Sequence, residues 1–246
     1  MAGILHMMNA PIGGSSGLAI LTDTANVNVA NMLTANGWDG ISVVHPVVSI
    51  GAGARVFSAI AGVPALDTGT LPTGSTVTLI NNGAILGRGG DGGAGGDLVP
   101  GGGAGPATGK PGGSGSIALK VRVPTTITNN GAIAGGGGGG GGGAMGPGGG
   151  GGAGAGLANG GRGGTSSNSS PGLAGANSTL EAPGAGGYMW TQGGNGGFYG
   201  SAGGGGASSV TGSYSGGLGG AAGPAVDGDS LVTWSVLGTI YGTRIG

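Results

Sequence analysis

Nine consecutive glycines, from Gly135 to Gly143, constrain this chain more than any other feature of its sequence. They lie in a long zone, residues 87–223, that holds most of the 73 glycines in the chain. Glycine loses more conformational freedom on folding than any other residue, at a cost of roughly 0.5–1 kcal/mol relative to alanine in regular structure. Such a zone must therefore either stay disordered or pack into a lattice that larger residues cannot enter.

The composition favours a folded protein over a flexible linker. Only 6% of the residues are charged and the formal net charge is −1, whereas disordered chains usually stay solvated through high net charge. A linker rich in glycine and serine would be uniform, but apolar, strand-like stretches interrupt this zone. The sequence predicts no membrane-spanning helix and no secretory signal. The seven basic residues are scattered, so no contact with nucleic acid is expected.

Short regular elements are expected on both sides of the glycine zone. Asp23 or Thr24 is expected to cap a short helix that runs to Leu33. Residues 43–50 are rich in β-branched side chains but contain Pro46, which predicts an edge strand. Further strands are expected at residues 75–80, 116–123 and 231–241, the last with Trp234 and Val236 on the same side.

A repeat is visible inside the chain. The sequence Asn-Asn-Gly-Ala-Ile occurs at residues 81–85 and again 48 positions later, at residues 129–133. Each copy follows a short predicted strand and precedes a glycine block. The spacing lies in the range of solenoid repeats, although two copies alone do not establish a solenoid.

The glycine blocks have a period of three. Residues 89–97, 193–198 and 216–221 read as Gly-Gly-X triplets, while the nine-glycine run rules out the strict pattern of collagen. An extended left-handed helix has three residues per turn, so two faces could pack backbone to backbone while the third carries side chains outward. A helix with neighbours on every side must be glycine throughout, which assigns the scaffold core to Gly135, Gly137, Gly139, Gly141 and Gly143.

These patterns predict a mostly irregular and β fold. Its centre is a bundle, or sandwich, of polyglycine II helices over residues 87–228, with protruding loops and flanking short strands. A small mixed region with a short helix and strands is expected over residues 1–86. A C-terminal strand over residues 229–246 is expected to pack back on the scaffold.

The sequence offers no catalytic constellation. The only histidines are His6 and His45, and Glu181 is the single glutamate. A G-x-S-x-G match at residues 13–17 lacks the strand and helix that this motif requires, and Asp227-Gly228-Asp229 reads as a turn. We therefore expect no enzyme, no cofactor and no metal site.

The turn Asn-Gly-Trp-Asp-Gly at residues 36–40, the repeated Asn-Asn-Gly-Ala-Ile and the nine-glycine run resemble the glycine-rich distal tail-fibre adhesins of tailed bacteriophages, including the T-even type. The resemblance runs from about residue 37 to the C-terminus. The first 35 residues depart from it, because they lack the tryptophan-rich start of the T-even form.

The resemblance implies a protein of the virion, at the distal tail fibre. Its N-terminal region would attach to the tip of a trimeric fibre, and loops on the polyglycine scaffold would bind a bacterial outer-membrane protein or surface glycan. These loops would be residues 165–181, 188–199 and 208–215. The candidate binding residues are Ser167, Asn168, Asn177, Tyr188, Met189, Trp190, Phe198, Tyr199 and Tyr214.

The residues leave other interpretations open. The aromatic side chains could seal the ends of the bundle instead of binding a receptor, although such residues on a rigid scaffold also suit an adaptable binding surface. An ice-binding protein would present long uniform triplets, and an inert structural protein would be more repetitive. Neither pattern matches triplets that break after two or three repeats.

Overall fold

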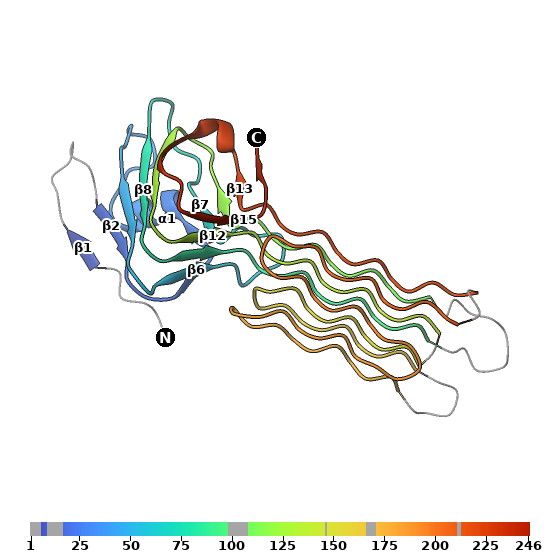
Figure 1. Cartoon of the computed structure of the whole chain (residues 1–246). Coiled ribbons are helices and arrows are strands. Elements are labelled where there is room, and N and C mark those ends of the chain that lie inside the picture. Colours follow the sequence, from blue (N-terminus) through green and yellow to red (C-terminus); the bar gives the residue numbers. More distant parts are fainter. Residues whose placement is uncertain (1–5, 9–16, 98–107, 146, 166–170, 211–212) are drawn as a thin grey trace.

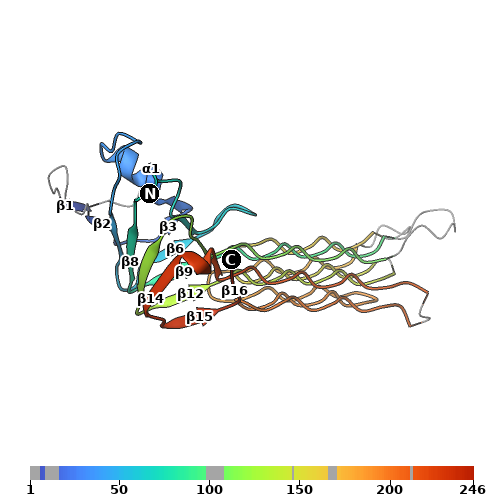
Figure 2. The same cartoon turned by 90° about the horizontal axis from the view of Figure 1, so that it is seen from above.

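The computed structural model describes residues 6–8, 17–97, 108–145, 147–165, 171–210 and 213–246. Short strands gather at one end of the molecule, and long wavy segments extend from them as a bundle (Figure 1). The same two parts are distinct when the molecule is seen from above (Figure 2). The fold is mostly β, with only two helices, α1 (Val29–Ala35) and the 3-10 helix η1 (Asp229–Leu231), in the described residues.

The strands form three sheets. All neighbouring strands are parallel except β1 and β2, which are antiparallel. The first sheet has the order β1 (His6–Met8), β2 (Gly17–Ile20), β5 (Val47–Ile50), β8 (Val77–Asn81), β11 (Thr125–Asn129) and β14 (Val232–Val236). The second contains β3 (Thr24–Ala25), β6 (Arg55–Phe57), β9 (Ala84–Leu86), β12 (Ala132–Ala134) and β15 (Thr239–Tyr241). The third contains β4 (Val27–Asn28), β7 (Leu66–Asp67), β10 (Leu119–Lys120), β13 (Val226–Asp227) and β16 (Arg244–Ile245).

From β2 onward, the chain visits the three sheets in turn and then moves up by one strand, so it forms a three-sided parallel β-helix. The coils are β2-β3-β4, β5-β6-β7, β8-β9-β10, β11-β12-β13 and β14-β15-β16. Alternate residues of the longer strands point inward. They stack from coil to coil as a core of fully buried side chains that includes Leu18, Val48, Leu79, Ile127 and Ile133.

The repeated sequence forms two consecutive coils. Asn81 pairs with Asn129, and Ile85 pairs with Ile133, so the two copies stack in register. The Asn81 amide nitrogen donates to Asn129 Oδ1 at 2.8 Å, and the Asn129 amide donates to the carbonyl of Leu237 at 2.7 Å. Both asparagines are fully buried, so the ladder satisfies polar groups that would be costly inside the core.

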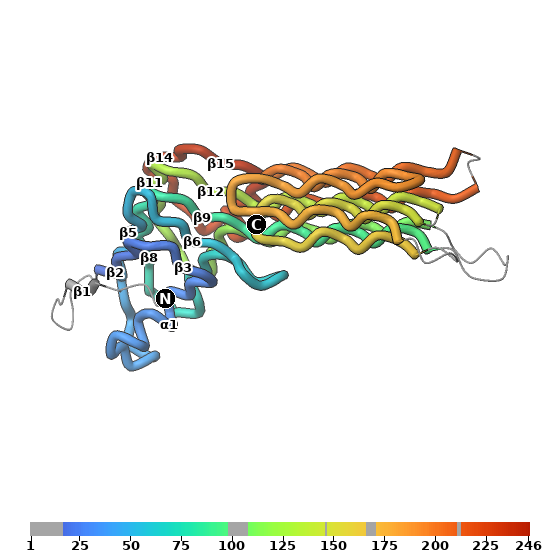
Figure 3. The backbone as a smooth tube through the Cα atoms, turned by 90° about the horizontal axis from the view of Figure 1, so that it is seen from below, coloured from blue at the N-terminus to red at the C-terminus, as the bar shows by residue number. Residues whose placement is uncertain are grey.

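The bundle grows from one corner of the β-helix. In two successive coils, the chain leaves the second sheet, enters the bundle and returns to the third sheet. Residues 87–118 make this excursion between β9 and β10, and residues 135–225 make a longer one between β12 and β13. The segments run side by side along the length of the bundle (Figure 3).

Hydrogen bonds join the segments with a period of three residues. Along residues 135–143, successive amides donate to three different segments, and the fourth returns to the first. The same stretch accepts bonds from residues 90–96, 194–200 and 217–223. Within this series, Gly136 donates to Ser116 (3.0 Å), Gly137 to Ala155 (3.1 Å), Gly138 to Ser201 (3.0 Å) and Gly139 to Gly113 (2.9 Å).

Close approach of the backbones explains the glycines. A Cβ atom on Gly139 would lie 2.1 Å from the carbonyl oxygen of Asp91, and one on Gly141 would lie 1.9 Å from that of Gly217. A second segment, residues 148–156, is enclosed in the same way and donates to three other segments. It contains Ala153 and Ala155, both fully buried. The prediction that an enclosed segment must be glycine on every face is therefore too strict, because this segment also accommodates alanine.

The expected helix begins later than the sequence suggested. Residues near Asp23 form β3 and β4, because they pair with β6 and β7 of the next coil. The helix starts at Val29, and the side chain of Asn28 caps it by accepting from the amide of Asn31 at 3.0 Å.

Three strand predictions were also wrong in detail. Of residues 116–123, only Leu119–Lys120 forms a strand, β10. Residues 43–50 do not form an edge strand: β5 starts after Pro46 and lies between β2 and β8. Residues 231–241 form two strands, because Gly238 (φ 60°) turns the chain from the first sheet to the second. Trp234 packs against the core but Val236 is exposed, since the register shifts where the strand passes Ile127 and Thr128.

Contacts between side chains join the two parts of the molecule. Arg55 of β6 donates to Asp23 at 2.6 Å and to Glu181 at 2.5 Å, and Glu181 lies in a turn of the bundle next to the β-helix. The hydroxyl of Tyr199 donates to the carbonyl of Leu180 at 3.0 Å and joins two such turns.

Candidate functional site

The end of the bundle farthest from the β-helix carries a group of turns, and we call it the far end. Segments of the bundle reach this end, or leave it, at five places (Figure 1). These places are residues 97 and 108, 145 and 147, 165 and 171, 188–191, and 209–214. Elsewhere in the bundle, backbone atoms fill the space between segments. Large side chains of residues 87–223 therefore have more room at the far end than along the segments.

The turn at residues 188–191 presents two aromatic rings on a fixed base. Thr191 is buried, its hydroxyl donates to the carbonyl of Ala144, and its own carbonyl accepts from Gly149 at 2.9 Å. Tyr188 and Trp190 are 60% and 59% exposed, and Met189 between them is half-buried. The turn thus holds a large apolar surface in water without packing it.

The turn at residues 209–214 is closed by its own hydrogen bonds. The amide of Ser209 donates to the carbonyl of Tyr214 at 3.0 Å, and the amide of Tyr214 donates to the hydroxyl of Ser209 at 3.1 Å. Tyr214 is half-buried, whereas Val210 is almost fully exposed. Ser209, Val210 and Tyr214 therefore mark a second place where side chains reach the far end.

Asp97, at the end of one glycine segment, is hydrogen-bonded to the end of another segment, at residues 162–165. Its carboxylate accepts from Arg162 at 2.7 Å and from the backbone amide of Thr165 at 2.8 Å. The hydrogen bond from Arg162 is the main cause that lowers the pKa of Asp97 to about 2, and the amide of Thr165 adds to it. No local sequence pattern indicates the pair of Asp97 and Arg162, because the two residues are far apart in the chain.

The other predicted binding residues lie elsewhere. Ser167 and Asn168 are outside the described residues. Asn177 lies within a returning segment and its side chain accepts from the amide of Gly160 at 2.9 Å, so it supports the bundle. Phe198 and Tyr199 are at the opposite end from Trp190, beside the β-helix.

Residues 188–199 are therefore not one loop. They form a turn at the far end, a glycine segment and a second turn next to the β-helix. At this second turn, burial raises the pKa of the Tyr199 hydroxyl well above its ordinary value, and the nearby Glu181 raises it further. This result agrees with the interpretation that some aromatic side chains seal an end of the bundle.

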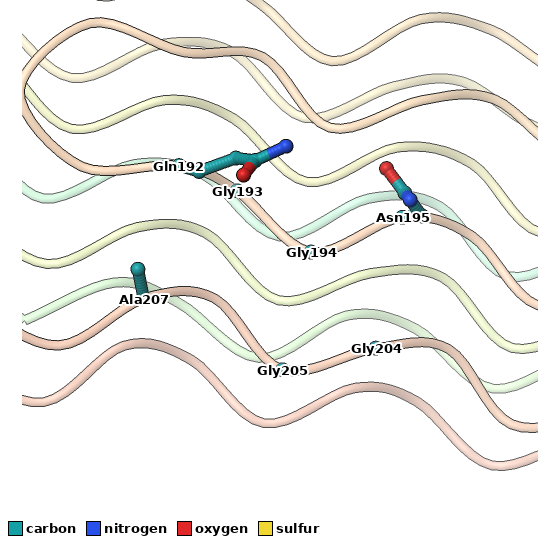
Figure 4. A pocket seen from close by; sticks show the side chains of 7 residues that line it. All are labelled: Gln192, Gly193, Gly194, Asn195, Gly204, Gly205 and Ala207. Atoms are coloured by element: carbon teal, nitrogen blue, oxygen red, sulfur yellow. The ribbon is translucent and has the colours of Figure 1, made fainter.

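A hollow of about 360 Å³ lies on the flank of the bundle, next to the turn at residues 188–191. Gln192, Asn195 and Ala207 line it together with glycines of the same two segments. The side chains of Gln192 and Asn195 point toward one another above the glycine backbone (Figure 4). No local sequence pattern indicates this hollow, because it lies between two segments.

The described residues contain no cluster of three or more histidine, cysteine, aspartate or glutamate side chains that could hold a metal ion. Among the described helices, none has the length and apolar character needed to cross a membrane. Besides the Asp97–Arg162 ion pair, the described residues of the far end present aromatic and hydroxyl groups for contact with another molecule.

Comparison with known proteins gives two findings. Residues 16–245 match the model of a family described as phage tail fibre adhesin Gp38. The chain also resembles a chain in the crystal structure of the gp37-gp38 adhesin tip complex of the bacteriophage S16 long tail fibre, with 33% sequence identity and a TM-score of 0.67. That match covers 95% of this chain and 84% of the other. No protein with a curated description matches.

The expected resemblance is thus confirmed. The chain belongs to the phage tail fibre adhesin Gp38 family, and its function is receptor binding at a tail fibre.

Proposed function

We propose that this adhesin binds its receptor on the bacterial surface through the far end of the bundle, with the turns at residues 188–191 and 209–214 at the centre of the contact. The observation that carries this proposal is the pair of exposed rings, Tyr188 and Trp190, on a turn anchored by buried Thr191. Aromatic side chains provide a large contact area at low conformational entropy cost, and they dominate many binding surfaces.

The scaffold proposed for these turns is a set of polyglycine II helices. The support is the period of three in the hydrogen bonds and the absence of strand pairing within the described part of the bundle. Helices of this kind have no internal hydrogen bonds and must bond to their neighbours. In this proposal, Gly135, Gly137, Gly139, Gly141 and Gly143 hold the binding turns in place and bind nothing themselves.

We assign attachment to the N-terminal region, residues 1–86, and receptor binding to the bundle, residues 87–228, with residues 229–246 closing the last coil. The related S16 chain occurs in a complex with gp37 at the tip of a long tail fibre, and we propose a corresponding fibre partner for this chain. The protein would then be part of the virion, with the bundle pointing away from the fibre. The proposal includes no enzymatic step.

A binding assay with paired variants tests the proposal. Replacing both Tyr188 and Trp190 with alanine should reduce binding of the purified protein to susceptible cells by at least about tenfold, because each exposed ring would contribute of the order of 1 kcal/mol or more. Phe198→Ala is the matched control, since this ring is similarly exposed (56%) but lies at the other end of the bundle.

Equal loss of binding in Phe198→Ala and in the double variant would contradict the assignment to the far end. Unchanged binding in the double variant would contradict it as well. The thermal unfolding midpoints of all variants should match that of the parent protein, because none of these rings is buried.

A further inference from the structure

The hollow on the flank of the bundle has the size of a ligand site. Its volume of about 360 Å³ lies within the range of about 300–1,000 Å³ that is usual for small-molecule sites. The Gln192 and Asn195 amides face it from one segment, and Ala207 faces it from the next (Figure 4). The amide oxygen of Asn195 accepts from the amide of Gly186 at 2.9 Å, which fixes this side chain in place.

Packing does not explain two of the glycines that line the hollow. A Cβ atom on Gly203 or Gly206 would lie 2.2 or 2.1 Å from a neighbouring backbone, so those residues must be glycine. Between them, a Cβ on Gly204 would have ordinary contacts at 3.5 Å, and one on Gly205 would have its nearest contact at 3.6 Å.

Gly204 also occupies a position that carries a side chain elsewhere in the same segment. Ser201 lies one triplet before it and Ala207 one triplet after it, and both are exposed. The missing side chain at Gly204 therefore leaves space that the packing of the bundle does not require.

The two segments that line the hollow carry no charged side chain. Residues 182–226 include no aspartate, glutamate, lysine, arginine or histidine, and this range contains both turns of the proposed receptor contact. A charged ligand would lose its hydration here without gaining an ionic partner.

We propose that the hollow is a subsite for an electrically neutral sugar unit of a bacterial surface polysaccharide, and that the polysaccharide continues across Tyr188 and Trp190. This inference rests on the proposed function and narrows the receptor to a neutral glycan. Amide side chains both donate and accept hydrogen bonds, as sugar hydroxyls do. The open space at Gly204 lets a ring approach the backbone between Gln192 and Asn195.

A variant that fills the hollow tests the subsite. Gly204→Leu should reduce binding to susceptible cells at least tenfold and leave the unfolding midpoint unchanged, since Leu218 occupies an equivalent outward position and is 77% exposed. Ala221→Leu is the matched control: it adds the same side chain on a different flank and should bind like the parent. Full binding by Gly204→Leu would overturn the subsite.

Treatment of the cells tests the chemical class without any variant. Binding of the unmodified protein should survive proteinase K, should be lost after periodate cleaves sugar diols, and should be the same between about 0.05 M and about 0.5 M NaCl, a range in which exposed ionic contacts weaken. Loss after proteinase K but not after periodate would overturn the inference in favour of a protein receptor.

An anionic glycan would give a different pattern. Binding would then fall with salt, and Lys110→Gln would weaken it, because Lys110 is an exposed cation of the bundle. That pattern would also overturn the inference while leaving the adhesin function intact. Failure of the unmodified protein to bind untreated susceptible cells would instead overturn the proposed function and this inference together.

Discussion

The β-helix and the bundle are held together in opposite ways. In the β-helix, side chains such as Leu79 and Ile127 fill the space between the sheets, and burial of apolar surface stabilises the fold. In the bundle, the segments are too close for side chains, and hydrogen bonds between backbones take over. Each such bond contributes only about 0.5–1.5 kcal/mol net, so the bundle depends on many of them at once.

The comparison explains how one chain can combine a stable base with an adaptable tip. A side-chain core needs a specific sequence in every strand. The enclosed part of the bundle needs only small residues, and its turns are free to carry other residues. Under the proposed function, receptor contacts at the far end could therefore change without disturbing either source of stability.

The largest effect is expected for a methyl group inside the bundle. In Gly139→Ala, the new Cβ would lie 2.1 Å from the carbonyl oxygen of Asp91. Backbone on all sides leaves no room to relax, so we expect a loss of more than about 3 kcal/mol or failure to fold. Gly205→Ala adds the same group where the nearest atom is 3.6 Å away and should unfold at the parental temperature. Similar midpoints for the two variants would show that the bundle is not packed as described.

A cavity in the β-helix should have the next largest effect. Ile127 is fully buried, and its replacement with alanine should cost about 2–5 kcal/mol, measured by chemical unfolding. Thr126→Ala on the outer face of the same strand is the control and should change stability by less than about 0.5 kcal/mol. Equal effects would mean that this strand is not packed against a core.

Loss of the buried asparagine ladder should lower the free energy of unfolding by less than the cavity at Ile127. Asn129→Ala removes a bond to Asn81 and a bond to the carbonyl of Leu237, both in the core. Leaving these partners unsatisfied should cost about 1–3 kcal/mol. Asn130→Ala, which removes an exposed bond to Asn82, should have a smaller effect in the same unfolding assay. A larger effect at Asn130 would contradict the role of the buried ladder.

Removal of the ion pair between Asp97 and Arg162 at the far end should have the smallest effect on the free energy of unfolding. The folded-state pKa of Asp97 is about 2, below its usual 3.8. Its stabilising effect is therefore present above about pH 3.8 and is lost as the pH falls through about 2. Because both partners are partly exposed, solvent weakens the pair, and Asp97→Asn should cost no more than about 1 kcal/mol at neutral pH.

This dependence can be measured as the difference in unfolding midpoint between the parent and Asp97→Asn. The difference should be constant between pH 5 and pH 7 and should shrink toward pH 2. A difference that grows as the pH falls would contradict the assigned ion pair.

The sequence predicted the features that depend on local pattern. The repeat at residues 81–85 and 129–133 forms stacked coils, and the chain belongs to the adhesin family that its glycine blocks resemble. The other coils share no visible motif and have only apolar residues at alternate strand positions, such as Leu18 and Ile20 in β2 and Val48 and Ile50 in β5. Two copies therefore could not reveal a β-helix with sheets of five strands or more.

Features that depend on distant contacts could not be predicted. Asp23 and Thr24 are residue types that often cap helices. In the structure, however, Thr24 belongs to β3 and pairs with Val56 of the next coil. The separation of Trp190 from Phe198 follows from the length of the glycine segment between them, although their closeness in the sequence suggests a single loop. The hollow beside Gly204 exists only because two segments lie next to each other.

The central claim is that the glycine segments form a rigid lattice bonded through the backbone. Hydrogen–deuterium exchange of the amides of Gly137, Gly140 and Gly143 tests it most directly, because each donates to a carbonyl of the segment at residues 148–156. We expect these amides to exchange as slowly as that of Ile127 in the β-helix. Exchange at the rate of an unstructured peptide would contradict the lattice and would indicate that the glycine zone is a flexible linker.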